Sequence, residues 1–160
     1  MVKFEYASLA GRIKRALLDL KWVVDRAELL QDKAQRSGDD GFFDGVALNL
    51  HSFYSGVERI FEDIARTIER SIPSGVEWHQ DLLLQMSAEI PLVRPPVIAS
   101  ETRDCLDEFR GFRHVVRNVY TFHLRPSRLQ ELTAQLQQCY LRVEQDLIDF
   151  TVFLEKLSQE

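Results

Sequence analysis

Apolar residues recur along this chain at steps of three and four, the spacing of residues on one face of an α-helix. The pattern predicts four long helices, over residues 4–36, 42–71, 100–123 and from 126 onward, and one short helix over residues 76–90. The side chains expected to face the core are Ile13, Leu17, Leu20, Trp22, Val23, Val24 and Ala27; Leu50, Phe53, Val57, Ile60, Phe61, Ile64 and Ile68; Leu82, Leu83 and Met86; Leu106, Phe109, Phe112, Val116 and Val119; and Leu129, Leu132, Leu136, Cys139, Val143, Leu147, Phe150, Leu154 and Leu157.

Helix breakers separate these segments. The turn at residues 37–41 contains two glycines, Pro73 and Gly75 follow the second segment, and prolines in residues 91–99 prevent the short helix from continuing. Pro126 stands where the first turn of a helix tolerates it. Because no segment alternates apolar and polar residues as a strand would, we predict one all-α domain over residues 1–160. Four long helices and one short helix should form an antiparallel up-and-down bundle.

Composition sets limits on the class of protein. With 45% hydrophobic and 28% charged residues, a chain of 160 residues can bury a core without disulfides. It has no apolar run of about 18 residues and no signal-peptide core, so we expect a cytoplasmic protein without a membrane segment. Cys105 and Cys139 match neither a disulfide framework nor a zinc spacing and are expected to be small buried side chains. Glu62, Asp63 and the histidines form no metal-ligand pattern, so no metal or cofactor is expected.

Basic residues are concentrated in one part of the chain. Residues 109–128 include five arginines, two histidines and no carboxylate, although the whole chain has 25 acidic and 20 basic residues and a net charge of −5. Arginines together with imidazoles, which titrate near neutral pH, suit a phosphate ligand. The candidate phosphate-binding residues are Arg110, Arg113, His114 and Arg125.

Helical geometry places part of this segment on one face. Arg110, His114, Arg117 and Thr121 lie within about 60° of one another on an ideal helix, on the side opposite the apolar stripe. His123 lies about 120° away from Arg117. The two can share a site if the helix loosens before His123, or if a second subunit supplies another copy. The alternative interpretation is a solvated helix face with His123 at the edge of the core.

The sequence Arg117-Asn118-Val-Tyr-Thr-Phe-His123 resembles the signature of the HEPN superfamily. That signature is an arginine, a polar residue that is often asparagine, and a histidine after four to six intervening positions; here there are five. The segment from Leu50 to Ala65 is similar to the second helix of HepT-like members of this superfamily. The order of the helices and the position of the motif agree with that family over nearly the whole chain.

The resemblance implies a metal-independent endoribonuclease, usually the toxin of a toxin–antitoxin pair whose antitoxin is a minimal nucleotidyltransferase. Many members are homodimers with two copies of the motif across a shared cleft. In that case His123 would act as general base or acid on RNA, Arg117 would hold the scissile phosphate, and Asn118 would position the phosphate or the histidine. Tyr120 and Glu58 are candidate supporting residues.

Two features differ from the HepT pattern. HepT toxins commonly have a tyrosine two positions after the histidine, which the antitoxin modifies with AMP, and this chain has Arg125 there. The gap of five residues between Arg117 and His123 is one longer than the usual gap in HepT proteins.

Several interpretations stay open. Glu58 is expected either to form a structural salt bridge with an arginine of the basic segment or to support the site. His79 is expected to be a surface residue at a helix start. The second functional hypothesis is a non-catalytic helical module that binds a nucleotide or a partner protein through the basic segment.

Overall fold

A computed structural model describes residues 2–118 and 124–160 of the chain, without the side chains of residues 2, 114, 115, 117 and 118. This part of the chain contains helices and loops but no β-strand, so the prediction of an all-α fold is confirmed. The helices are α1 (Val2–Ser37), α2 (Gly41–Ile64), the π-helical turn η1 (Ala65–Glu69), α3 (Trp78–Ser87), α4 (Ser100–Asn118) and α5 (Pro126–Gln159).

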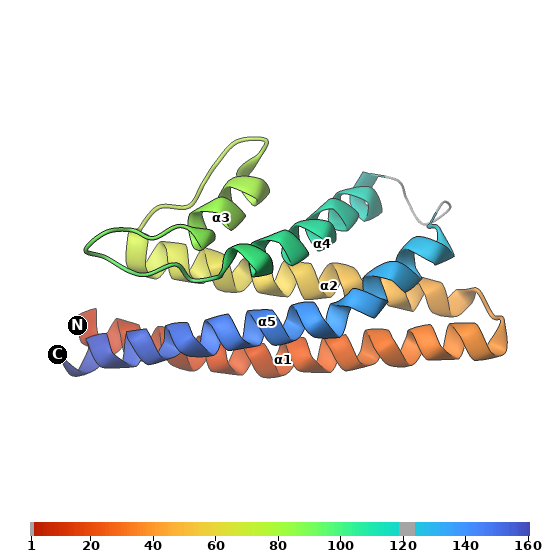
Figure 1. The fold of residues 1–160 in the computed structure, drawn as a ribbon, viewed down its shortest axis with the longest axis horizontal. Helices are drawn as coiled ribbons and strands as arrows, with labels where there is room; N and C mark the ends of the chain where they lie inside the picture. Colours follow the sequence, from red (N-terminus) through yellow and green to blue (C-terminus); the bar gives the residue numbers. More distant parts are fainter. Residues whose placement is uncertain (1, 119–123) are drawn as a thin grey trace.

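The four long helices run alternately in opposite directions, as the up-and-down prediction requires (Figure 1). Helices α1 and α5 lie side by side, α2 packs on them, and α4 crosses the side of α2 that faces away from α1. The short helix α3 packs against α2 and α4. Both chain ends lie at one end of the bundle, and the end of α4 and the start of α5 lie at the other (Figure 1).

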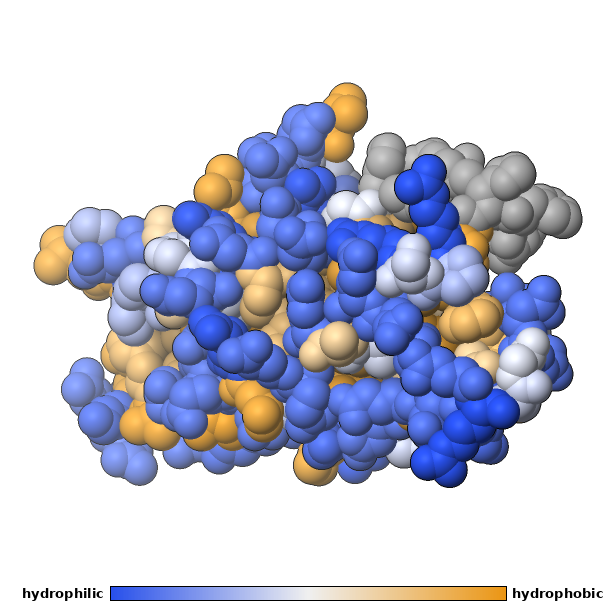
Figure 2. Space-filling model, turned by 45° about the vertical axis from the view of Figure 1, so that its right-hand side comes forward, coloured by the Kyte–Doolittle hydropathy of each residue, from blue (hydrophilic) through white to orange (hydrophobic). Residues whose placement is uncertain are grey.

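The predicted apolar stripes form one core. Leu20 of α1, Val57 of α2, Leu106 of α4 and Leu136 of α5 are each no more than 3% exposed. Val23, Ile68 and Val116 are partly buried against this core. Leu157 is partly buried, and Val119 lies outside the described residues. Hydrophilic side chains cover most of the face shown in Figure 2, and apolar side chains show there in scattered areas.

One core prediction is wrong. Trp22 was expected to widen the buried face of α1, but 66% of its surface is exposed. On a helix of 100° per residue, Trp22 points about 180° from the mean direction of the buried residues of α1, which explains its exposure.

Two glycines allow α1 and α2 to pack closely. A Cβ atom at Gly56 would lie 2.7 Å from Leu20 Cδ2, and a Cβ atom at Gly45 would lie 2.8 Å from Leu30 Cδ1. Real Cβ atoms do not approach other atoms so closely, so the helix pair depends on the missing side chains at both positions.

The second helix changes its form before the point where we predicted its end. Its α-helical part stops at Ile64, a π turn follows, and Arg70 ends the turn in the left-handed conformation with φ of 54°. The last residue of the π turn forms a buried ion pair: Glu69 Oε1 lies 2.5 Å from Arg94 Nη2, and the Arg94 side chain is fully buried. Arg94 also donates to the carbonyl oxygens of Gln85 and Ala88, which holds the loop after α3 against the bundle.

The two cysteines form a disulfide between α4 and α5, which corrects the prediction of unpaired thiols. Cys105 and Cys139 are 34 residues apart, with Cα atoms separated by 5.9 Å. Their linear spacing gave no signal because the pairing depends on how two separate helices pack. The bridge closes a loop that contains the whole arginine-rich segment, residues 109–128.

Within the described ranges, no helix is both long enough and apolar enough to cross a membrane.

Candidate functional site

The arginine-rich segment lies at one end of the bundle, on the last turns of α4 and the first turn of α5 (Figure 1). Arg110 and Arg113 belong to α4 and are partly buried, whereas Arg125 precedes α5 and is exposed. The backbone of residues 114, 117 and 118 is helical, so the predicted residues His114, Arg117 and Asn118 belong to α4. Tyr120 and His123 lie outside the described residues.

Some arginines of this segment are paired with carboxylates that lie outside residues 109–128. Arg110 Nε donates to Asp107 Oδ1 at 2.7 Å, and Arg128 contacts Glu108 Oε2 at 2.9 Å and Glu131 Oε2 at 3.4 Å. The hydrogen bond that Arg128 donates to the Glu108 carboxylate raises the pKa of Arg128. The positive charge that is concentrated in sequence is therefore partly compensated in space.

Glu58 is buried beneath α4 and is paired with a residue that the sequence did not identify. Its side chain is 6% exposed, and its Oε2 atom lies 2.6 Å from His79 Nδ1. His79 does stand at the start of a helix, as predicted, but its side chain is only 19% exposed, so the prediction of a surface residue is wrong. No pattern along the chain could show this pairing, because it joins α2 to α3 across 21 positions.

His79 also contacts the basic segment. Arg113 Nη1 lies 3.3 Å from His79 Nε2, so the imidazole lies between a carboxylate of α2 and a guanidinium of α4. Glu58 thus reaches an arginine of the basic segment through a histidine rather than by the direct salt bridge that the sequence suggested. The indole of Trp78 stacks on the imidazole with ring centroids 3.7 Å apart and limits its rotation.

Tyr54 belongs to the same buried cluster. Burial raises the pKa of its phenol, and the negative charge of Glu58 adds to the rise, while Arg110 and Arg113 oppose it. Tyr54 precedes Glu58 by four residues, so the two lie on one face of α2. This spacing was present in the sequence and would have identified Tyr54 as a neighbour of Glu58.

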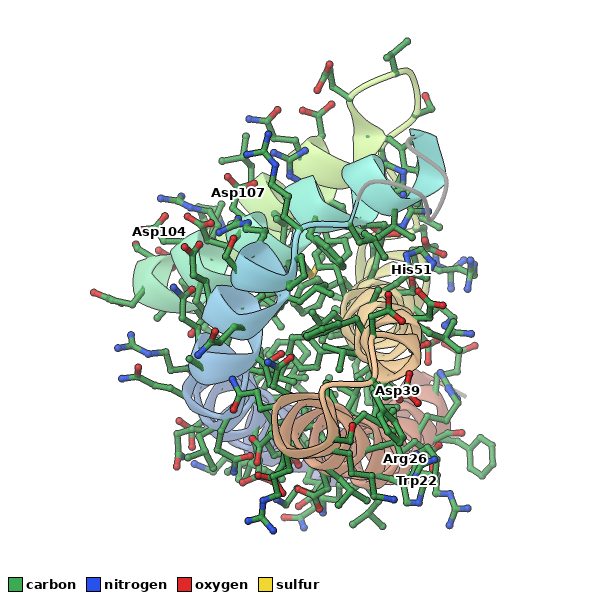
Figure 3. All side chains as sticks on the ribbon, turned by 90° about the vertical axis from the view of Figure 1, so that its right-hand side faces the viewer. Trp22, Arg26, Asp39, His51, Asp104 and Asp107 are labelled. Atoms are coloured by element: carbon green, nitrogen blue, oxygen red, sulfur yellow. A yellow bond between two sulfur atoms is a disulfide. The ribbon has the colours of Figure 1, made fainter. Side chains whose placement is uncertain are left out.

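The same region of α2 contains His51 and Ser55. Ser55 Oγ lies 3.5 Å from His51 Nε2, and both side chains are partly buried. His51 and Asp107 lie well apart in the view along the bundle (Figure 3). Asp107, which pairs with Arg110, therefore does not lie beside His51.

A cavity of about 480 Å³ lies between α4 and the start of α5. Gly111 and Phe112 line it from α4, and Arg125 and Arg128 line it from the other side. Of the predicted site residues whose side chains are described, Glu58 and Arg113 lie in the cluster with His79. Arg110 is paired with Asp107 but is close enough to this cluster to oppose the rise in the pKa of Tyr54, and Arg125 lies at the cavity.

Among the described residues, no group of three or more histidine, cysteine, aspartate or glutamate side chains is arranged to hold a metal ion. The chemistry that these residues offer is that of a guanidinium held beside a buried carboxylate and imidazole. Such a group binds an oxyanion with charge and with directed hydrogen bonds.

A family model described as HepT-like protein matches residues 45–154 of the chain. The match includes nearly all of α2, the whole of α3 and α4, and most of α5, and with them the Glu58, His79 and Arg113 cluster. Neither the comparison with curated proteins nor the comparison with solved structures finds a match.

Proposed function

We propose that this chain, which belongs to the HepT-like protein family, is a metal-independent endoribonuclease of the toxin type. The family is generally one of HEPN-type ribonucleases, and the residues from Arg117 to His123 lie within the matched range. That position of the motif, inside a family match and at the end of α4, is the observation that supports the proposal most strongly.

The proposed reaction is transfer of the phosphoryl group to the neighbouring ribose oxygen. His123 removes the proton from the 2′-OH, the 2′ oxygen attacks the adjacent phosphorus, and the bond from phosphorus to the 5′ oxygen breaks. The 5′ oxygen leaves as it takes up a proton from water, and the other product ends in a 2′,3′-cyclic phosphate. DNA lacks the nucleophile and should remain intact.

Arginine residues stabilise the charge that develops on the phosphate. Arg117 holds two phosphate oxygens through the planar edge of its guanidinium, and Asn118 positions the phosphate or the histidine. Arg110, Arg113, His114 and Arg125 bind neighbouring phosphates, with Tyr120 and Glu58 in supporting roles. Because Arg110 and Arg128 are already paired with carboxylates, Arg113 is the described arginine of α4 whose contacts best suit this task.

We further propose that the active form is a homodimer in which two copies of the motif line a common groove. Like charges from two arginine segments repel each other unless an anion lies between them, and RNA supplies that anion. The expected partner in the cell is a minimal nucleotidyltransferase antitoxin. With Arg125 in the position of the tyrosine that HepT antitoxins modify, that antitoxin would have to inhibit this chain in another way.

The test of the proposed activity is incubation of the purified protein with a labelled single-stranded RNA and with DNA of the same sequence, each with and without EDTA. We expect cleavage of the RNA alone, cyclic phosphate ends, and no effect of EDTA. Cleavage that EDTA abolishes, or equal cleavage of DNA, would contradict the proposal.

A second function receives support from the pairing of Arg110 and Arg128 with carboxylates, which reduces the positive charge offered to a substrate. This alternative is a non-catalytic module that binds a nucleotide or a partner protein at the same residues. A protein that binds RNA or nucleotide without cleaving RNA would favour it.

A further inference from the structure

We propose that His79, in the short helix α3, is a positioning residue that fixes Arg113 for contact with an RNA phosphate next to the scissile one. This inference rests on the proposed function, since it assigns a task to a residue outside the motif. It also gives α3 a role, because α3 is the element that inserts an imidazole between α2 and α4.

The first step concerns Glu58. A carboxylate that is 5% exposed is costly to bury unless donors and a positive charge compensate it. His79 Nδ1 lies 2.6 Å from Glu58 Oε2, so that ring nitrogen must bear a hydrogen that it donates to the carboxylate. Glu58 therefore determines which nitrogen of the imidazole is protonated.

The second step concerns the other ring nitrogen. A neutral imidazole with hydrogen on Nδ1 has a lone pair on Nε2, and Arg113 Nη1 lies 3.3 Å from that atom. The arginine is always protonated, so the contact works only if Nε2 accepts. A protonated His79 would instead place an N–H group and a second positive charge against the guanidinium. The three side chains therefore form one directed series in which Arg113 donates to His79 and His79 donates to Glu58.

The third step concerns what the series does to Arg113. An arginine loses much side-chain entropy when it is held in one rotamer, and a guanidinium that is already fixed binds an anion with less of that loss. Arg113 as a whole is only partly buried, so a phosphate can approach the side chain from solvent, although its Nε atom is itself buried.

The fourth step places Arg113 relative to the motif. Arg113 precedes Arg117 by four residues on α4, so the two positions lie one turn apart on one face of the helix. Two guanidinium groups at that spacing suit adjacent parts of one phosphodiester chain. His79 thus acts on the substrate only through Arg113.

Two substitutions of His79 separate its contacts. In His79→Asn, the amide nitrogen can occupy the position of Nδ1 and still donate to Glu58, but no atom reaches Arg113. In His79→Gln, the longer side chain can place an amide oxygen near the position of Nε2 and still accept from Arg113. Both variants lose the stacking of the ring on Trp78, so each controls for that loss in the other.

The measurement is the steady-state cleavage of a labelled single-stranded RNA by both variants, alone and combined with Arg113→Ala. His79→Asn should raise KM roughly tenfold with kcat almost unchanged, because a lost phosphate contact removes binding common to the ground and transition states. His79→Gln should lie closer to the wild type. In the Arg113→Ala background, His79→Asn should cause no further rise in KM.

An unchanged KM in His79→Asn would overturn the inference. So would a double variant whose rise in KM is the product of the rises caused by His79→Asn and by Arg113→Ala alone. In both cases cleavage by the wild type would leave the proposed function standing. Should the wild type not cleave RNA, the proposed function fails, and the RNA dissociation constants of the same variants test the inference alone. Roughly tenfold weaker binding by His79→Asn, absent in the Arg113→Ala background, would support it, and equal binding would overturn it.

A spectroscopic test needs no variant. The nitrogen chemical shifts of His79 in the labelled wild-type protein should show hydrogen on Nδ1 and none on Nε2 at neutral pH. Hydrogen on Nε2 would exclude the donation by Arg113 and would overturn the inference whatever the kinetics show.

Discussion

Arg94 Nη2 lies 2.5 Å from Glu69 Oε1, and this buried ion pair joins the π turn after α2 to the loop after α3. Arg94→Ala leaves the Glu69 carboxylate, whose side chain is 6% exposed, without its cation. We expect a loss of about 3–5 kcal/mol in the free energy of unfolding. Urea denaturation of the variant and of the wild type measures this difference in the free energy of unfolding.

The control for that measurement is Arg36→Ala, which removes an exposed ion pair with Asp32. Its effect should stay below about 1 kcal/mol. Equal midpoints for Arg94→Ala and the wild type would show that the buried pair does not hold these segments together.

Gly56→Ala tests the close approach of α1 and α2. The added methyl group would lie 2.7 Å from a methyl carbon of the buried Leu20, and overpacking of this kind costs about 1–3 kcal/mol. Gly11→Ala is the matched control, since a Cβ atom there has no neighbour within 4 Å. Alanine is also the better helix former, so Gly11→Ala should stabilise the protein by about 0.5–1 kcal/mol. Thermal unfolding of both variants should show shifts of opposite sign.

The disulfide should contribute to stability through the loop that it closes. Replacing Cys105 and Cys139 together by serine removes a bridge across 34 positions, and we expect a loss of about 2–4 kcal/mol. A thiol assay on the unfolded wild type without reductant should detect no free thiol. Detection of two thiols, or unfolding that is insensitive to reductant, would contradict the bridge.

The buried tyrosines predict how stability changes at alkaline pH. Burial raises the pKa of Tyr54 and of Tyr140 above the usual value of 10.0. The unfolded phenols lose their protons first, so the unfolded state binds fewer protons above pH 10 and the free energy of unfolding falls as pH rises. Tyrosinate absorbance should show these two phenols ionising only with unfolding, whereas their ionisation in the folded protein near pH 10 would contradict the burial effect.

The sequence predicted the helices well because their stripes are local patterns. Leu20, Val57 and Leu136 each belong to a stripe of apolar residues that repeats at the helical period within its own helix. That period determines which face of each helix is buried. The error at Trp22 came from treating a large apolar side chain as buried by type, although its angle on the helix points to solvent.

The site was harder to predict because its contacts join distant helices. The pairing of Glu58 with His79 depends on where α3 packs, and so does the contact of His79 with Arg113. The bridge between Cys105 and Cys139 depends in the same way on how α4 lies against α5. The assignments of Arg117, Asn118 and His123 stay predictions.

The central claim is that His123 and Arg117 cleave RNA, and the most direct measurement is the cleavage rate of a labelled single-stranded RNA by two variants. His123→Ala should lower the rate by about 10²–10⁴, since it removes the proposed general base. Arg117→Lys should lose most of the activity, since an ammonium group keeps the charge but not the paired hydrogen bonds. Arg142→Lys, an exposed position of α5 outside the segment, is the control and should cleave like the wild type. Undiminished cleavage by His123→Ala in a folded protein would contradict the account.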